Sequence, residues 1–176
     1  GIEDVMGYPS PRALAARIGS LAKPDAVIPR VEGLAAYPLS PAQQRIWFLQ
    51  KLHEGGQVYV IPFAARLRGP VDAVALQKAL TLLEERHDAL RLRVALDAPE
   101  QSLAPAGGLR LECYDTPLTD AAYLGMSLPL GPERPLVRVA LFRQEDGSHA
   151  LVFCFHHIIF DGWSAEVITR ELNEAY

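Results

Sequence analysis

The densest group of polar residues in the sequence is the stretch 156–162, which reads HHIIFDG. It follows an apolar run and precedes a segment with helical periodicity, and loops at strand ends often carry functional groups. A neutral imidazole can accept or shuttle a proton near neutral pH, so either histidine could serve as an acid–base group. The stretch therefore indicates an acid–base or acyl-transfer site centred on one histidine.

The two histidines of this stretch are not expected to act together on one substrate. Successive residues of a strand point to opposite sides, so one of His156 and His157 should turn inward while the other faces a cavity. Asp161 could orient the loop through hydrogen bonds or an ion pair, and Gly162 would allow a positive φ or a close backbone approach where the helix begins. The alternative is that the histidines are purely structural, the commoner role at a strand end.

Other kinds of site are disfavoured by residue spacing. Two adjacent histidines cannot easily chelate one ion, and the usual spacing of zinc ligands is missing. The sequence contains no Gly-x-Ser-x-Gly elbow, which argues against a serine hydrolase. The glycine pairs at 55–56 and 107–108 lack the context of a phosphate-binding loop. We therefore expect no metal site and no phosphate-binding loop.

The elements that position the polar stretch are predicted from periodicity. Residues 149–156 are nearly all apolar, as expected of a central strand covered on both faces. Together with 136–142 and the intervening Gly147 they predict a hairpin, and 163–176 predict the helix after it. Further helices are expected at 10–22, 40–52 and 72–86, further strands at 58–67, 90–96, 101–104 and 109–114, and an irregular crossing at 115–135. This order predicts a mixed α/β or α+β fold with helices packed on one mixed β-sheet.

Composition limits the class of protein. The 176 residues include 49% apolar residues, which suits a soluble globular domain and not a disordered chain. A net charge of −4 leaves no basic excess for nucleic acid. The longest strongly apolar run, 150–155, is far shorter than the ~20 residues that span a bilayer. Cys113 and Cys154 support neither a disulfide framework nor a cysteine metal site. Cys154 lies in an apolar run and is expected to be a buried, reduced thiol, which favours a cytoplasmic setting.

Three stretches resemble, in the right order, motifs of the condensation domains of nonribosomal peptide synthetases. Residues 156–162 resemble the HHxxxDG signature, and 40–49, SPAQQRIWFL, resemble the opening motif S-x-A-Q-x-R-x-W-x-L. Residues 86–91, RHDALR, resemble R-H-E-x-L-R, with Asp88 in place of the usual glutamate. HHxxxDG is shared with several acyltransferase families, whereas three motifs in order are highly specific. The resemblance covers nearly all of residues 37–176.

The resemblance implies a fold and a division of the chain. Condensation domains have two lobes, each similar to chloramphenicol acetyltransferase, with a tunnel between them. Residues 37–176 would be the N-terminal lobe. Residues 1–22 resemble the last part of a peptidyl carrier protein, and 23–36, with its prolines, would be a linker. On this interpretation the chain is a fragment of a longer protein, which its start without Met and its end inside a predicted helix also suggest.

The resemblance also implies an activity and partners. In condensation domains the amine of an aminoacyl group on the downstream carrier protein attacks the thioester on the upstream carrier protein. Both substrates are tethered by 4′-phosphopantetheine arms that the carriers deliver, so no cofactor is expected to be covalently bound to this chain. The C-terminal lobe would be a further partner, and neither nucleic acid nor membrane is expected. The lobe by itself would be inactive, and apolar surface meant for the second lobe would favour self-association.

Carried over residue by residue, the resemblance makes His157 the catalytic candidate. It would act as a general base, or it would position the amine or stabilise the charged tetrahedral intermediate. His156 would be structural, and Asp161 would pair with an arginine of the second lobe. Gly162 would offer a backbone N–H to the site.

The other two motifs are expected to support the fold. Arg86 and Arg91 would brace the lobe near the tunnel. For Gln43, Arg45 and Trp47 we expect helix packing and no direct chemistry. The paired histidines differ from the aspartates of cyclisation domains, and the first motif favours the subtype that joins two L-residues.

Two alternatives to this function stay open. A free-standing acyltransferase of the same superfamily would use a soluble thioester such as acyl-CoA, but the carrier-like residues 1–22 argue against it. A non-catalytic recruitment domain of the same fold would usually carry a damaged HHxxxDG motif, whereas the motif at 156–162 is intact.

Overall fold

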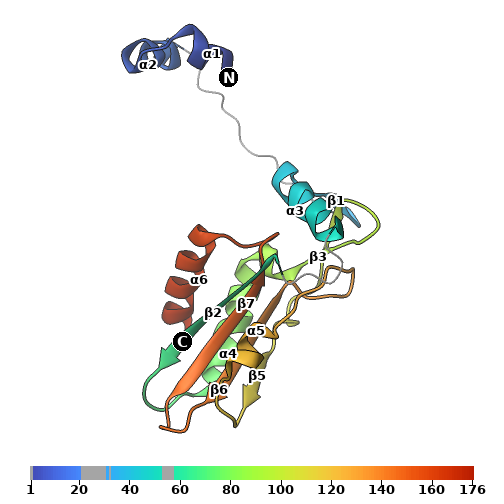
Figure 1. Cartoon of the computed structure of the whole chain (residues 1–176), viewed down its shortest axis with the longest axis vertical. Helices are drawn as coiled ribbons and strands as arrows, with labels where there is room; N and C mark the ends of the chain where they lie inside the picture. Colours follow the sequence, from blue (N-terminus) through green and yellow to red (C-terminus); the bar gives the residue numbers. More distant parts are fainter. Residues whose placement is uncertain (1, 21–30, 32, 53–57) are drawn as a thin grey trace. The chain divides into compact units, whose positions relative to one another are not determined.

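The computed structural model, drawn in Figure 1, describes residues 2–20, 31, 33–52 and 58–176. The chain divides into two compact units, residues 1–34 and residues 35–176. Most of the expected linker 23–36 lies outside the described residues.

The first unit contains two short helices, α1 (Ile2–Gly7) and α2 (Pro11–Ser20). α2 confirms the helix predicted at 10–22, and its cap is Ser10, whose hydroxyl accepts the Ala13 N–H at 3.2 Å. α1 was not predicted. The Arg17 guanidinium donates to Asp4 Oδ1 at 3.1 Å and ties the two helices together. Among the side chains described in this unit none is buried, so local contacts hold these helices.

The second unit is built on a four-stranded sheet in the order β2-β7-β6-β5 (Figure 1). Its strands are β2 (Val60–Leu67), β5 (Leu111–Tyr114), β6 (Val137–Arg143) and β7 (His149–His156). β7 pairs antiparallel with β2 and β6, whereas β5 runs parallel to β6. The sheet is therefore mixed, and the most apolar strand lies inside it, as predicted.

The residue types found at the hairpin turn and at the sheet edge suit the backbone geometry of those positions. β6 and β7 form the predicted hairpin, in which Gly147 takes a φ of 79° and the Gln144 N–H donates to the Ser148 carbonyl at 2.8 Å. A side chain at that φ would strain the backbone, which explains the glycine. β2 is an edge strand of this sheet and pairs on one side with β7, a position where a proline without an N–H is tolerated.

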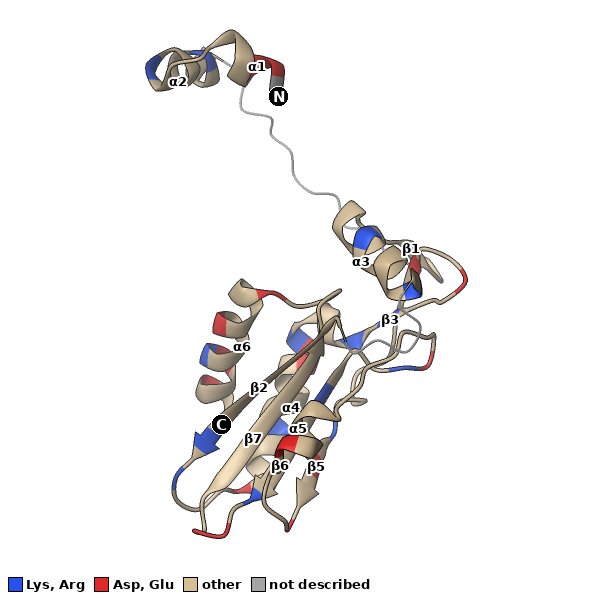
Figure 2. Cartoon of the chain, viewed as in Figure 1, with Lys and Arg blue, Asp and Glu red and all other residues tan. Residues whose placement is uncertain are grey.

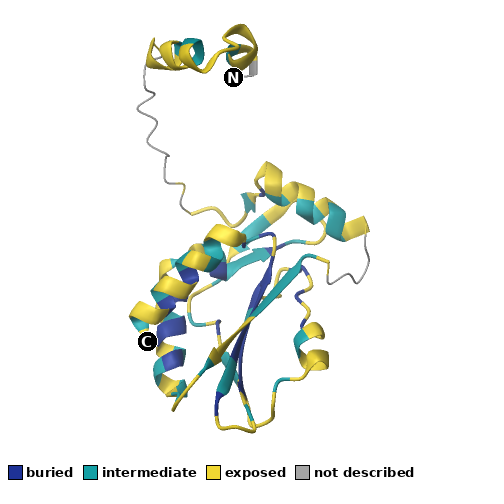
Figure 3. Cartoon of the chain, turned by 60° about the vertical axis from the view of Figure 1, so that its left-hand side comes forward, coloured by how far each residue is buried: buried dark blue, intermediate teal, exposed yellow. Residues whose placement is uncertain are grey.

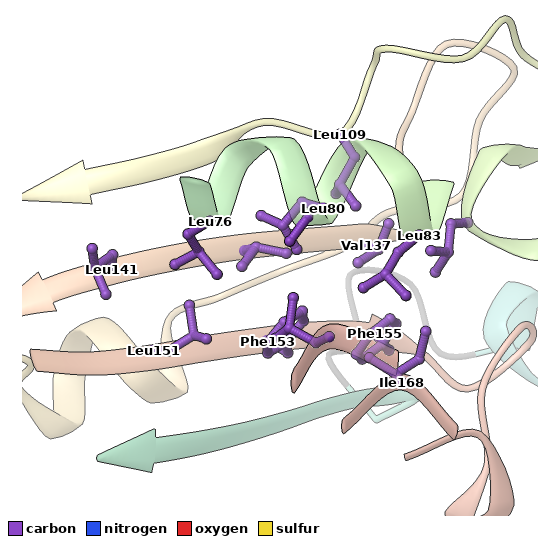
Figure 4. Packing of buried hydrophobic residues seen from close by; sticks show 14 of the residues in the cluster. Leu76, Leu80, Leu83, Leu109, Val137, Leu141, Leu151, Phe153, Phe155 and Ile168 are labelled. Atoms are coloured by element: carbon purple, nitrogen blue, oxygen red, sulfur yellow. The ribbon is translucent and has the colours of Figure 1, made fainter. Parts of the chain in front are cut away.

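Two long helices, α4 (Ala73–Arg86) and α6 (Gly162–Ala175), cover one face of this sheet. α4 begins as predicted at Asp72, whose carboxylate accepts two backbone N–H groups at 2.9 and 3.0 Å. In Figure 4 leucines of α4 and Ile168 of α6 point towards the side chains of β6 and β7. The buried members of this face include Leu76, Leu80, Leu83, Val137, Leu141, Leu151, Phe153 and Phe155. This layer of helices on a mixed sheet confirms the predicted fold class.

The opposite face of the sheet is covered by the segment that joins β5 to β6. The segment is mostly irregular, as expected for 115–135, but it contains the short helix α5 (Asp120–Leu124). Met126 and Leu128 pack there against inward residues of β6 and β7. One of these is Cys154, a free thiol whose pKa burial raises to about 11, so it stays protonated at neutral pH. Figure 3 shows the burial concentrated in the strands and on the inner sides of the helices.

A second, three-stranded sheet was not predicted. It consists of β1 (Tyr37–Pro38), β4 (Glu100–Leu103) and β3 (Leu92–Val94), in that order. The expected single sheet is thus joined by a small one, in which β4 pairs antiparallel with both β1 and β3. Helix α3 (Pro41–Leu52) follows β1. A cluster of Leu39, Val94, Leu130, Leu136 and Ile158 joins this small sheet to the end of β7.

Charged side chains lie on the helices, the loops and several strands, including Arg138 and Arg143 of β6, whereas β7 carries no Lys, Arg, Asp or Glu (Figure 2). Among the charged residues that the structure describes, Glu84 is the buried one, with a side chain that is 2% exposed. Its carboxylate accepts the backbone N–H groups of residues 107, 108 and 109 at 2.7, 3.1 and 3.0 Å. Within the described part of the chain, no helix is both long and apolar enough to cross a membrane.

Candidate active site

The polar stretch connects two rigid elements. β7 ends at His156 and α6 begins at Gly162, so the loop between them is short. The His157 N–H donates to the Tyr59 carbonyl at 2.7 Å, and this bond attaches the loop to the chain just before β2. Phe160 is buried, and its ring stacks on Phe155 with the centroids 3.8 Å apart. Backbone and side chain therefore both hold the loop in place.

His156 turns inward, as predicted for one member of the pair. Its side chain is fully buried, and its Nδ1 accepts the Ile158 N–H at 3.1 Å. In the neutral ring the proton must then sit on Nε2. Burial, with a smaller contribution from the charge of His157, lowers the pKa of His156 to about 4. His156 is therefore neutral at working pH and supports the loop backbone.

We expect this burial to make stability depend on pH between about 6.5 and 4. An unfolded histidine takes up a proton below about 6.5, whereas folded His156 stays neutral until about pH 4. In that window the unfolded state binds more protons, so the free energy of unfolding falls as the pH falls, by up to about 3 kcal/mol. Urea unfolding at several pH values across the window measures this slope.

The matched variant for this prediction is His156→Asn. Its side-chain oxygen can still accept the Ile158 N–H, but it cannot titrate. The variant should lose less stability than the unchanged protein across the same pH window. Identical slopes for the two proteins would contradict the titration of a buried His156.

His157 takes the opposite orientation and is exposed. Its Nδ1 lies 2.8 Å from the Phe160 carbonyl oxygen. A carbonyl oxygen can only accept, so the ring proton is on Nδ1, and Nε2 of the neutral ring carries a free lone pair. The adjacent histidines thus hold opposite tautomers. His156 supports the loop backbone, and His157 has an Nε2 lone pair that can act as a base.

His157 opens onto a cleft of about 490 Å³. The cleft is lined by α3, by the turn after α4, by β3 and by the beginning of α6. Its lining residues are Ser40, Ala42, Gln43, Ile46, Ala89, Leu92, His157, Ile158, Ile159, Phe160, Asp161 and Ser164. The prediction that one histidine faces a cavity is confirmed.

Asp161 caps α6. Its Oδ1 accepts the Ser164 N–H at 2.9 Å and the Ser164 hydroxyl at 2.6 Å, while its own N–H donates to the Ser164 hydroxyl. The bonds from Ser164 hold the pKa of the Asp161 carboxyl below its ordinary value, so it is ionised at neutral pH. These hydrogen bonds cap the helix, and the expected orienting of the loop by Asp161 stays a prediction. The ion pair with an arginine of a second lobe stays a prediction.

The conformational expectation for Gly162 is wrong. Gly162 does not have a positive φ, and no atom lies within 4 Å of the place that a Cβ would take. It is the first residue of α6, where helical backbone suits most residues. Its N–H belongs to the first turn, whose donors have no partner within the helix, so donation to a substrate stays a prediction.

The arginine that opens the second motif braces two helices. Arg86 Nη1 lies 3.4 Å from Glu171 Oε2 on α6, and His87 Nε2 lies 2.7 Å from the same oxygen. The hydrogen bond with His87 keeps the pKa of Glu171 below its ordinary value. Arg86 therefore joins α4 to α6, but it is absent from the described lining of the cleft.

Arg91 closes the same motif at the end of the 3₁₀ turn η1 (Asp88–Arg91). It forms an ion pair with Asp88 and donates to the Ala104 carbonyl at 3.1 Å. Like Arg86 it does not line the described cleft, although Ala89 of the motif does. Both arginines thus make contacts within the fold, and the expected bracing near the tunnel stays a prediction.

The residues of the first motif differ in their positions, since some pack against the core and others line the cleft. Trp47 packs into the cluster at the end of β7, and its Nε1 donates to the Ala95 carbonyl at 2.8 Å, which confirms the packing expected of it. Arg45 is exposed. Gln43 also lines the cleft beside His157, a position that the expectation of helix packing did not include. Its position in a motif that recurs with HHxxxDG was the available signal.

The arrangement suits proton transfer next to an apolar wall. His157, whose neutral ring carries a lone pair on Nε2, lines a cleft whose other sides include Ile46, Leu92 and Phe160. Among the described residues no group of three or more His, Cys, Asp or Glu is arranged to hold a metal ion. An amine held near Nε2 could pass its proton to the ring while it attacks an acyl carbon.

Comparison with known proteins identifies relatives along most of the chain. The family model described as condensation domain matches residues 34–176. Nonribosomal peptide synthetase kk1B of Curvularia clavata is 35% identical over 99% of this chain, which spans 1% of that protein. Chondramide synthase of Chondromyces crocatus is 38% identical over 79% of this chain and 4% of that protein. The chain thus spans a small part of the curated relatives it matches.

Solved structures show the same fold. The starter condensation domain of the rhizomide synthetase RzmA matches with a TM-score of 0.70 and 22% identity over 81% of this chain and 38% of that chain. A chain from the complex of the X-domain and OxyB of teicoplanin biosynthesis matches with a TM-score of 0.73 and 29% identity. That match covers 90% of this chain and 35% of the other.

Proposed function

The chain belongs to the condensation domain family, and from this membership we propose that it forms amide bonds in a nonribosomal peptide synthetase. The observation that carries the proposal is the hydrogen bond from His157 Nδ1 to the Phe160 carbonyl, because in the neutral ring it leaves the lone pair on Nε2 of a histidine that lines the cleft. The donor is an aminoacyl or peptidyl thioester on an upstream carrier protein. The acceptor is the amine of an amino acid on a downstream carrier.

The proposed role of His157 is that of a general base. As the acceptor amine attacks the thioester carbonyl, a C–N bond forms and the amine proton passes to Nε2. The tetrahedral intermediate then expels the thiolate of the phosphopantetheine arm, which takes the proton from the imidazolium and leaves as a thiol. His156 keeps the loop in register, Asp161 caps α6, and Arg86 and Arg91 brace the elements behind the site.

The domain organisation proposed for the chain follows from the family. Residues 37–176 form the N-terminal lobe, 23–36 a linker, and 1–22 the tail of a peptidyl carrier protein. In support, the family match begins at residue 34, and the chain covers 38% of the starter condensation domain it resembles. The second lobe completes the tunnel, and the two carrier proteins deliver the phosphopantetheine arms. The free, buried Cys154 supports a cytoplasmic setting.

The proposed function is tested by supplying the donor group on its carrier protein. The complete domain should form the amide from a donor on its carrier protein and an acceptor on the downstream carrier, in a single turnover followed by mass spectrometry. Residues 1–176 by themselves should form none, since they provide one side of the tunnel. Product from the separate lobe would refute the two-lobed assignment.

A second candidate function is a CoA-dependent acyltransferase. The observation that favours it is a solved structure, at a TM-score of 0.71, of the rhizomide starter domain variant in complex with C8-CoA. Offering the same acyl group as its CoA thioester separates the two functions. Equal rates from CoA and carrier donors would favour this candidate, and no amide from either donor would favour a recruitment domain.

A further inference from the structure

We infer that Gln43 is a positioning residue, whose side-chain amide holds the loop that carries His157. Gln43 lies on α3 and His157 follows β7, yet both line the same cleft. The inference rests on the proposed function, in which His157 acts on the acceptor amine.

The amide of Gln43 uses all of its hydrogen-bonding groups. Its Oε1 accepts the Ser40 N–H at 2.9 Å and Nε2 of Gln101 at 3.2 Å. Its Nε2 donates to Oε1 of Gln101 at 3.0 Å and to the Ile158 carbonyl at 3.4 Å. A primary amide has two N–H donors and two acceptor lone pairs, so none is left for a substrate. Gln43 therefore acts on the loop and not on the reacting groups.

The peptide groups of Ile158 are held on both sides by side chains. Its N–H donates to His156 Nδ1 at 3.1 Å, and its carbonyl accepts from Gln43 at 3.4 Å. His157 is the preceding residue, and its ring is oriented by the bond to Phe160 across the same turn. A displaced Ile158 carbonyl would therefore shift the turn that orients the imidazole.

The other end of the Gln43 network is anchored in the small sheet. Gln101 lies on β4, and its Nε2 also donates to the Pro38 carbonyl of β1 at 3.2 Å. At the first turn of α3 the Ser40 hydroxyl accepts the Gln43 N–H at 3.3 Å, which completes a capping box. The cap directs the Gln43 amide back over the helix end. The small sheet thus serves as the frame against which the catalytic loop is aligned.

The test compares Gln43→Glu with its neighbour Gln44→Glu in the complete domain. The carboxylate in Gln43→Glu still accepts from Ser40 and Gln101, but it can donate neither to the Ile158 carbonyl nor to Oε1 of Gln101. Gln44 donates to the Leu39 carbonyl at 2.9 Å, and no bond from it to the loop is described. We expect Gln43→Glu to lower kcat by about 10- to 100-fold with KM for the donor carrier unchanged. Gln44→Glu should keep the rate of the unchanged protein.

A double-mutant cycle distinguishes positioning from general support of the fold. If Gln43 acts through His157, Gln43→Glu should have little further effect on the rate once His157→Asn is present. Full additivity of the two effects, or a kcat of Gln43→Glu equal to that of Gln44→Glu, would overturn the inference.

Hydrogen exchange provides a readout that does not depend on activity. Exchange of the backbone amides of 157–159 should accelerate in Gln43→Glu and stay unchanged in Gln44→Glu. If the unchanged domain forms no amide, the proposed function fails, while the exchange rates still decide whether Gln43 holds the loop. Equal protection of these amides in both variants would show that it does not.

Discussion

Replacing His157 by alanine in the complete domain is expected to lower the rate of amide formation by about 10²- to 10⁴-fold. Among the described residues that line the cleft, the titratable groups are His157 and Asp161. Asp161 is held ionised by its bonds to Ser164 and is engaged in capping α6. Without His157 the amine proton has no positioned acceptor. Single-turnover mass spectrometry of the carrier-bound product measures the loss.

His157→Asn separates proton transfer from loop geometry. An asparagine amide can donate to the Phe160 carbonyl as Nδ1 does, but it has no group that takes up a proton at neutral pH. Comparable losses in the alanine and asparagine variants would support the general base. Recovery in the asparagine variant would instead assign His157 to holding the loop. Undiminished amide formation by His157→Ala would refute any catalytic role.

Replacing Glu84 by alanine is expected to reduce the free energy of unfolding by about 3–5 kcal/mol. The buried carboxylate accepts three consecutive N–H groups, and truncation leaves these donors without their partner. These bonds hold the turn that leads into β5, where Gly107 has a φ of 92°. Urea unfolding at neutral pH, monitored by circular dichroism, gives the difference.

The adjacent glutamate provides the control for this prediction. Glu85 is exposed on the same helix, so Glu85→Ala should change the free energy of unfolding by no more than about 0.5 kcal/mol. Glu84→Gln keeps the shape but turns one acceptor into a donor that faces a backbone N–H, so it should be intermediate. Equal stabilities of Glu84→Ala and Glu85→Ala would show that the buried carboxylate contributes nothing.

Elements with local causes could be read from the sequence. The apolar run 149–156 predicted an inner strand, and alternation along it predicted that His156 and His157 face opposite ways. The helix predicted at 72–86 begins at Asp72, which caps it by bonding to residues two and three positions along the chain. Each of these features depends on neighbours in the sequence.

The sequence by itself determined the main strands, the long helices and the family, because periodicity, capping and motif order are properties of nearby residues. Only the tertiary structure decided how the site is held together. Gln43 reaches Gln101 and Ile158, which are 58 and 115 positions away, and Gln101 lies in a small sheet whose pairing was not predicted. The free Nε2 of His157 likewise depends on which carbonyl folds against Nδ1. Such contacts form only when distant segments pack, so no local pattern encodes them.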